Sequence, residues 1–146
     1  TGASFGGLTP ARLLETRVGD GLVTIDGQQQ GIGPVGADRT IELPVLGRGL
    51  VPATGVGAVA LNVTVTEPTN GSFLTVFPAG DTRPLASSVN MVRGQTVPNM
   101  VFARVGTDGK VSIYNNSGAT HVVVDVVVVV VDVVVVVGSA QLRSAG

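Results

Sequence analysis

Apolar and polar residues alternate along much of this chain with a period of two. The clearest example spans residues 58–66, where one set of alternate positions is apolar and the other is mostly polar: Val59, Leu61, Val63 and Val65 against Ala60, Asn62, Thr64 and Thr66. This period is that of a β-strand with one buried face. We therefore predict an antiparallel strand over 58–66 with its odd-numbered side chains in the core.

Other segments rich in β-branched and apolar residues, separated by turn residues, predict the remaining strands. They are a short edge strand within 1–17, then 40–46, 72–77, 87–92, 99–105, 110–114 and 120 to at least 126. Residues 19–37 are predicted to form a long loop with a short strand at 22–25.

Two dipeptides are typical of tight hairpins, Asn70-Gly71 and Asp108-Gly109. They predict that 58–66 pairs with 72–77, and that 99–105 pairs with 110–114. About eight or nine short strands joined by turns predict an all-β fold, an antiparallel β-sandwich of jelly-roll type.

Composition agrees with this class and excludes several functions. The 146 residues include 21 glycines and 8 prolines, and this length is enough for one domain. The net charge is -1 with no block of either sign, which argues against a nucleic-acid partner. The chain has no cysteine, so it has neither a disulfide nor a thiolate metal site.

The end of the chain carries an unusual tract, because residues 122–137 hold fourteen valines and only two other residues, Asp125 and Asp132. It is shorter than the roughly 20 apolar residues of a membrane-spanning helix, and its carboxylates argue further against a span. Two interpretations stay open beyond Val126: a true apolar strand, or backbone traced in a density map without resolved side chains, with valine as the default residue. The second is favoured, so the residue identities in 127–146 are treated as doubtful.

Several motifs follow one another in a specific order between residues 8 and 126. They include Leu8-Thr9-Pro10, Arg12-Leu13-Leu14-Glu15-Thr16-Arg17, Gly47-Arg48-Gly49, Ala60-Leu61-Asn62-Val63-Thr64-Val65, Gly94-Gln95-Thr96-Val97-Pro98-Asn99 and Val105-Gly106-Thr107-Asp108-Gly109-Lys110-Val111. In this combination the chain resembles a β-rich repeat domain of secreted and surface proteins of actinobacteria and related bacteria. The resemblance implies secretion and a structural or adhesive role without enzymatic activity.

The chain departs from that family pattern at two places. Many members carry a cysteine pair where this chain has Ala79 and Ser112, so the implied disulfide and its typical stabilisation of about 2 to 4 kcal/mol are absent. Members also end in an Asp-Val-x-Gly-Tyr-Phe strand, whereas valines follow Asp125 and Val126 here.

The titratable residues do not suggest a catalytic or metal site. His121 is the only histidine, and a strand would place it about 13 Å from Asp125 along one face, so it is interpreted as a surface or sheet-edge residue. Five aspartates are scattered rather than spaced as in a calcium loop: Asp20, Asp26, Asp38, Asp81 and Asp108. We therefore assign no catalytic, cofactor-binding or metal-binding residue.

The densest charged cluster is Arg12, Glu15 and Arg17, and Arg83 and Arg93 are further cations in turn-like positions. It is interpreted as an ion-pair network that locks the N-terminal strand to the sheet. The alternative is a clamp for a carboxylate or a sugar hydroxyl, because guanidinium groups bind such partners.

Asparagines and aromatic residues are the side chains that could carry or bind sugars. Asn62, Asn70 and Asn115 fit the Asn-x-Ser/Thr sequon, with Asn70 and Asn115 predicted in turns, but turn chemistry and strand alternation are the favoured explanation. The aromatic residues are assigned mostly to the core, which weakens a sugar-stacking role; they are Phe5, Phe73, Phe77, Phe102 and Tyr114.

Together these patterns predict a non-enzymatic extracellular or cell-surface protein that needs no cofactor. Residues 1–7 would be an extended N-terminal segment, 8–126 the β-sandwich domain and 127–146 an extended C-terminal strand or tail. The chain would be a subunit of a surface filament, sheath or layer, assembled with copies of itself by strand addition through termini and sheet edges. The alternative is a non-catalytic module that binds cell-wall glycan or another polysaccharide.

Peptide mass spectrometry of the purified protein tests the interpretation of the valine tract. We expect the peptide that covers 127–137 to contain residues other than valine, including an aromatic pair. Fragment masses that correspond to valine at every position except 132 would show that the tract is a true apolar strand.

Overall fold

The computed structural model describes residues 3–132, with side chains from residue 9 to residue 131. It contains eight strands and one short 3-10 turn. The strands are β1 (Ala3–Glu15), β2 (Arg39–Pro44), β3 (Val56–Thr66), β4 (Ser72–Pro78), β5 (Val89–Met91), β6 (Val97–Arg104), β7 (Lys110–Asn115) and β8 (His121–Asp132), and the turn η1 is Thr107–Gly109. Within this described part no helix has the length and hydropathy to cross a membrane.

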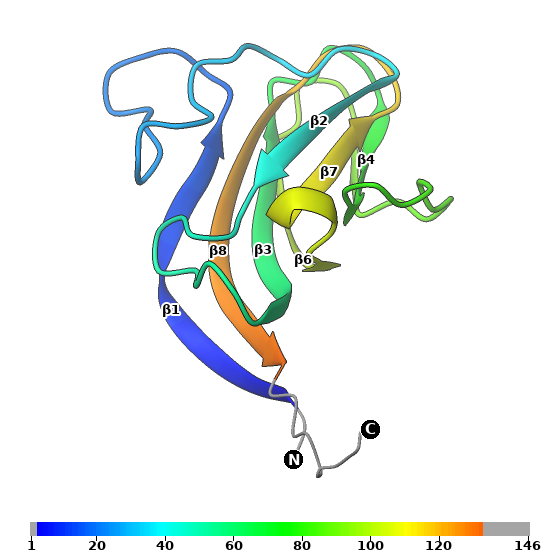
Figure 1. The fold of residues 1–146 in the computed structure, drawn as a ribbon. Coiled ribbons are helices and arrows are strands. Elements are labelled where there is room, and N and C mark those ends of the chain that lie inside the picture. Colours follow the sequence, from blue (N-terminus) through cyan, green and yellow to red (C-terminus); the bar gives the residue numbers. More distant parts are fainter. Residues whose placement is uncertain (1–2, 133–146) are drawn as a thin grey trace, which may run out of the picture.

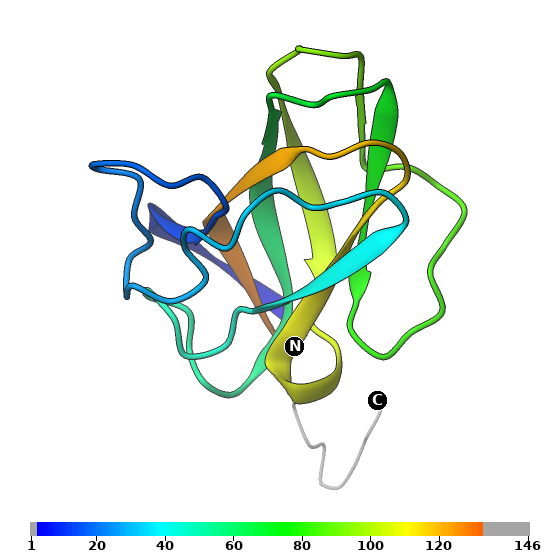
Figure 2. The same cartoon turned by 90° about the horizontal axis from the view of Figure 1, so that it is seen from above.

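The strands form two antiparallel four-stranded sheets that pack face to face (Figures 1 and 2). The first sheet has the order β1-β8-β3-β6 and the second the order β2-β7-β4-β5. This confirms the predicted all-β sandwich. The jelly-roll subtype stays a prediction, with which eight strands in two sheets are compatible.

Both predicted hairpins are wrong, because each pair of strands is divided between the two sheets. β3 pairs with β6 and β8, and β4 pairs with β5 and β7. Both edges of β3 are therefore occupied before β4 could pair with it. The connection also lacks hairpin geometry: Glu67 has a φ of 56°, whereas neither Asn70 nor Gly71 has a positive φ, as a type I′ turn requires.

The turn at Asp108-Gly109 has the expected positive φ values of 58° and 71°. It nevertheless carries the chain from β6 in the first sheet to β7 in the second. The dipeptide therefore predicted the backbone conformation correctly and the strand pairing wrongly.

The first strand and the last strand of the described chain lie side by side. β1 is an edge strand, as predicted, but it has 13 residues and is not short. Its first residues, Ala3–Gly7, pair with Val128–Asp132 of β8. The sheet thus extends on both sides of the predicted 8–126 domain; β8 continues to Asp132, and the rest of the predicted 127–146 segment lies outside the described residues.

The core lies between the two sheets and contains the side chains predicted from the alternation. Val59, Leu61, Val63 and Val65 are all fully buried. Valines of β8 join them, with a register shift between the last two; they are Val122, Val124, Val126 and Val129. Residues 19–37 form a loop as predicted, but the segment 22–25 within it is not a strand.

Gly106 allows the chain to pass between the sheets at the start of η1. A Cβ atom at this position would fall against the backbone nitrogen and oxygen of Ala79, and 2.8 Å from the carbonyl carbon of Pro78. Because these are backbone atoms of a neighbouring segment, they cannot move without breaking the bond from the Thr107 amide to the Ala79 carbonyl, 2.8 Å long.

We therefore expect Gly106→Ala to lower the free energy of unfolding by roughly 3 kcal/mol, as other overpacking substitutions do. Urea unfolding followed by circular dichroism measures it. Gly71→Ala is the matched control, because the nearest atom to its added Cβ is 3.8 Å away and its expected change is within about 0.5 kcal/mol. Equal effects of the two substitutions would contradict this account of Gly106.

Candidate functional site

The charged cluster at the end of β1 is the ion-pair network that the sequence predicts. Glu15 is fully buried and accepts two hydrogen bonds, each 2.9 Å long, from the Arg17 guanidinium. Arg12 bridges Glu15, at 3.2 Å, and Asp125 of β8, at 3.0 Å. The network therefore fastens β1 to β8, and it leaves few free donors for a bound carboxylate.

Burial by itself would raise the pKa of Glu15. The hydrogen bonds from the side chain and the backbone of Arg17, with the charges of Arg17 and Arg12, outweigh burial and hold this pKa below its ordinary value. The same bond to Glu15 raises the pKa of Arg17. The carboxylate thus stays ionised inside the protein because it is fully paired.

A second ion pair, which the sequence did not predict, joins the partly exposed Asp26 to the buried Arg48. The Arg48 guanidinium donates two bonds of 2.8 Å to the Asp26 carboxylate, and it also reaches the carbonyl oxygens of Pro44 and Gln28 at 2.9 and 3.1 Å. The side chain of Arg48 is only 4 % exposed. It pins the long loop after β1 to the segment after β2.

The Gly47-Arg48-Gly49 motif is the feature of the sequence that could have indicated the burial of Arg48. Both glycines have a positive φ, 73° and 58°, so the chain turns sharply around Arg48 and directs its side chain inward. Nothing in the sequence indicated Asp26, which is 22 residues away. The hydrogen bonds from Arg48 hold the pKa of Asp26 well below its usual range.

The only histidine is not paired with Asp125. The Nδ1 atom of His121 lies 2.8 Å from the Oγ1 atom of Thr16, while Asp125 binds Arg12. Among the side chains from residue 9 to residue 131, no three His, Asp or Glu residues are close enough together to hold a metal ion.

The sequon asparagines occupy different environments. Asn115 was predicted in an exposed turn, but it is the last residue of β7 and is fully buried. Its Nδ2 atom donates to the carbonyl oxygens of Val35, Gly36 and Gly118. Asn115 is therefore a structural residue that a glycan could not reach, whereas Asn70 is exposed in a turn.

Tyr114 and Phe73 pack near one another on the second sheet, with ring centroids 6.2 Å apart. The Arg83 guanidinium lies 3.7 Å above the Tyr114 ring, and the Tyr114 hydroxyl donates a 2.9 Å bond to Asp38. Burial, followed by this bond, raises the pKa of Tyr114. The ring face that a sugar would need is already covered by Arg83.

Among the aromatic side chains that the structure describes, Phe102 departs most from the predicted burial; Phe5 lies outside them. Phe102 is 65 % exposed, and its neighbour on the same face of β6, Met100, is 52 % exposed. The alternation in β6 is regular, with Val101 and Ala103 buried. The apolar residues Met100 and Phe102 therefore occupy the positions where a polar residue is expected.

β6 also has backbone groups that bond to no other residue in the described part of the chain. The Val105 amide donates to the Gly57 carbonyl, 3.0 Å, and these residues continue the β3–β6 register by one position beyond the pair Ala58 and Arg104. Since bonding alternates along an antiparallel pair, the odd-numbered residues of β6 bond to β3. The even-numbered residues, Pro98, Met100, Phe102 and Arg104, direct their backbone groups to the open edge of the sheet.

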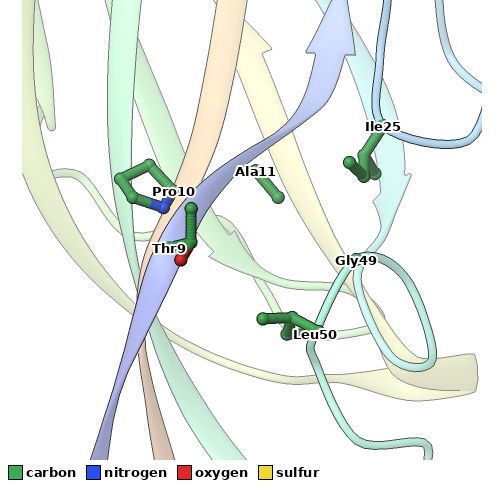
Figure 3. A pocket seen from close by; sticks show the side chains of 6 residues that line it. All are labelled: Thr9, Pro10, Ala11, Ile25, Gly49 and Leu50. Atoms are coloured by element: carbon green, nitrogen blue, oxygen red, sulfur yellow. The ribbon is translucent and has the colours of Figure 1, made fainter.

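A shallow apolar groove lies at the opposite edge of the same sheet, beside β1 (Figure 3). Its volume is about 250 Å³. It is lined by Thr9, Pro10, Ala11, Ile25, Gly49 and Leu50. Ile25 and Leu50 are 57 % and 64 % exposed. The groove therefore offers an apolar contact surface, and none of its lining residues is charged.

A scan against models of known protein families finds no match to this chain. A search of curated protein sequences finds none either.

The ion pair of Asp26 and Arg48 predicts a specific dependence of stability on pH. The folded pKa of Asp26 is depressed, so the pair contributes stability above the unfolded value of about 3.9. That contribution is lost as the pH falls through 3.9 towards the folded pKa. We expect Asp26→Asn to destabilise the protein by about 2 to 3 kcal/mol at pH 7, because it leaves Arg48 buried without its counter-ion.

The Asp26→Asn variant should also lose less of its remaining stability between pH 5 and pH 2 than the unsubstituted protein. Urea unfolding at several pH values measures both effects. Asp20→Asn is the control, since Asp20 is exposed and forms no hydrogen bond or ion pair with the described side chains. Acid curves of the same slope for all three proteins would refute the assignment.

Proposed function

We propose that this protein is an extracellular structural subunit that assembles into a surface filament, sheath or layer by strand addition between neighbouring copies. The observation that carries the proposal is the open edge of β6. Secretion and a structural role rest on the resemblance to the β-rich repeat domain of actinobacterial surface proteins.

An open edge with apolar side chains is a template for a further strand, since the incoming backbone satisfies free N–H and C=O groups. In β6 these groups belong to the four even-numbered residues from Pro98 to Arg104. Proline lacks an N–H group, so its position at the open edge leaves the β3 ladder intact.

Each of the other three edges of the described sandwich is covered in part, short or charged. The backbone of β1 near its end is covered by the long loop, whose Gln29 carbonyl and Gly31 amide bond to Glu15 at 3.0 and 2.7 Å. β5 has only three residues. β2 carries charged Arg39 and Glu42 on its six residues, and charges discourage edge-to-edge pairing.

The termini support a different arrangement from the one that the sequence suggests. Ala3–Gly7 and Val128–Asp132 pair with one another inside the chain, so these segments are not free to enter a neighbour. Residues 1–2 and 133–146 lie outside the described residues. Strand addition is therefore assigned to the edge of β6.

An open polymer needs two different contacts or one that does not close on itself. The β6 edge and the apolar groove beside β1 lie at opposite edges of one sheet. Contacts at both places would extend a row of subunits in one direction.

The alternative function is a non-catalytic module that binds cell-wall glycan or another polysaccharide. Phe102 favours it, because an exposed aromatic ring can stack on a sugar. The adjacent row of the sheet, in the order Met100, Asn62, Asp125 and Arg12, supplies the Asn62 amide, which can bind hydroxyls, while Arg12 and Asp125 bind each other.

Met100→Pro separates the two functions. The substitution removes an N–H group at the open edge and leaves the β3 ladder and Phe102 in place, so the fold and any stacking on Phe102 should persist. We expect assembly, observed by negative-stain electron microscopy, to be lost in Met100→Pro and kept in Met100→Leu, which retains the amide.

Pull-down on insoluble peptidoglycan and on chitin, with both variants, completes the test. Retention of all proteins on a glycan, with no assembly by the unsubstituted protein, would favour the binding module. Normal assembly of a folded Met100→Pro variant would overturn strand addition at β6.

A further inference from the structure

We propose that the open edge of β6 binds the same edge of a second copy of this chain, with the two strands antiparallel and related by a two-fold axis at Val101. The pairing would join two four-stranded sheets into one sheet of eight strands across both subunits. This inference rests on the proposed function, because it names the partner that strand addition would use at β6.

The backbone pattern of β6 complements itself. Four residues of β6 have outward backbone groups: 98, 100, 102 and 104. When Met100 lies opposite Phe102 of the second copy, each of these four lies opposite a residue whose backbone groups also point outward. Each Met100–Phe102 pair can exchange two N–H to C=O bonds. Each Arg104 amide can donate to the carbonyl oxygen of Pro98 in the other copy. Pro98 has no N–H group to donate in return, so the pairing ends there.

The side chains are suited to the same register. Met100 and Phe102 are exposed on the outer face of the sheet, with 52 % and 65 % of their area accessible, and the register places the thioether of one beside the ring of the other. Contacts between methionine sulfur and aromatic rings are favourable. A partner strand would therefore cover the two apolar side chains that the isolated subunit leaves open.

The charge on β6 is compatible with a second copy in this register. Arg104 is its only charged residue. Because each Arg104 lies opposite Pro98 of the other strand, the two guanidinium groups are six residues apart, which is about 20 Å along a strand. That separation exceeds the screening length of about 8 Å at physiological salt, so like charges do not oppose the pairing.

Cysteine crosslinking tests the partner and the register together. The chain has no cysteine, so every disulfide comes from the introduced residues. In the proposed register position 100 of one copy and position 102 of the other have Cα atoms about 5.5 Å apart, within disulfide reach. Met100→Cys, with a tag that changes its mass, is mixed with untagged Phe102→Cys and oxidised with glutathione buffer.

We expect the mixed species to exceed either self-crosslinked species at least five-fold on a non-reducing gel. Arg104→Cys is the control, because its two sulfur atoms would be about 20 Å apart and should not crosslink. Circular dichroism confirms that each variant is folded.

Dominant self-crosslinking of Met100→Cys, of Phe102→Cys or of Arg104→Cys would overturn the proposed register. If filaments form without any of these crosslinks, β6 does not pair with β6 of another copy. Strand addition at another edge would then still account for the filaments. Sedimentation of the unsubstituted protein as a monomer at all concentrations would count against both proposals.

Discussion

The position of β8 between β1 and β3 is the constraint on which the rest of the fold depends. This strand pairs on one side with the first strand of the chain and on the other with β3, so closing the sheet requires contacts between residues more than 100 positions apart. Its alternate valines fill the core from one face, while Asp125 on the other face binds Arg12. Once β8 and β6 flank β3, the next strand along the chain has to join the opposite sheet.

The same constraint explains where the fold is closed and where it is open. Burying β8 at the centre leaves β1 and β6 as the edges of the first sheet. The chain covers the end of β1 with a long loop, and it fixes that loop through Arg48 and Asp26 and through the backbone bonds of Glu15. Within residues 3–132 no such loop covers β6, where Met100 and Phe102 face outward.

The buried charges of this protein belong to its architecture. Glu15, Arg48 and their partners satisfy nearly every donor and acceptor of their charged groups within the protein. Such pairs hold loops to strands because removing one partner leaves a buried charge behind. The groups that remain available to a partner lie on the first sheet, where the ring of Phe102 is next to the outward backbone groups of β6.

The sequence by itself determined the fold class, most of the strands and the inward-facing residues, because a period of two and turn residues are local signals. Val59 to Val65 illustrate this, as does the ion-pair network of Arg12, Glu15 and Arg17. It did not determine which strands are neighbours: Asn70-Gly71 suggested a hairpin, and only the tertiary structure, in which both edges of β3 are occupied, sent β4 to the other sheet. The exposure of Phe102, the burial of Asn115 and the pairing of Asp26 with Arg48 were likewise decided by the packing of distant segments, since no spacing along the chain records which side of a strand remains uncovered.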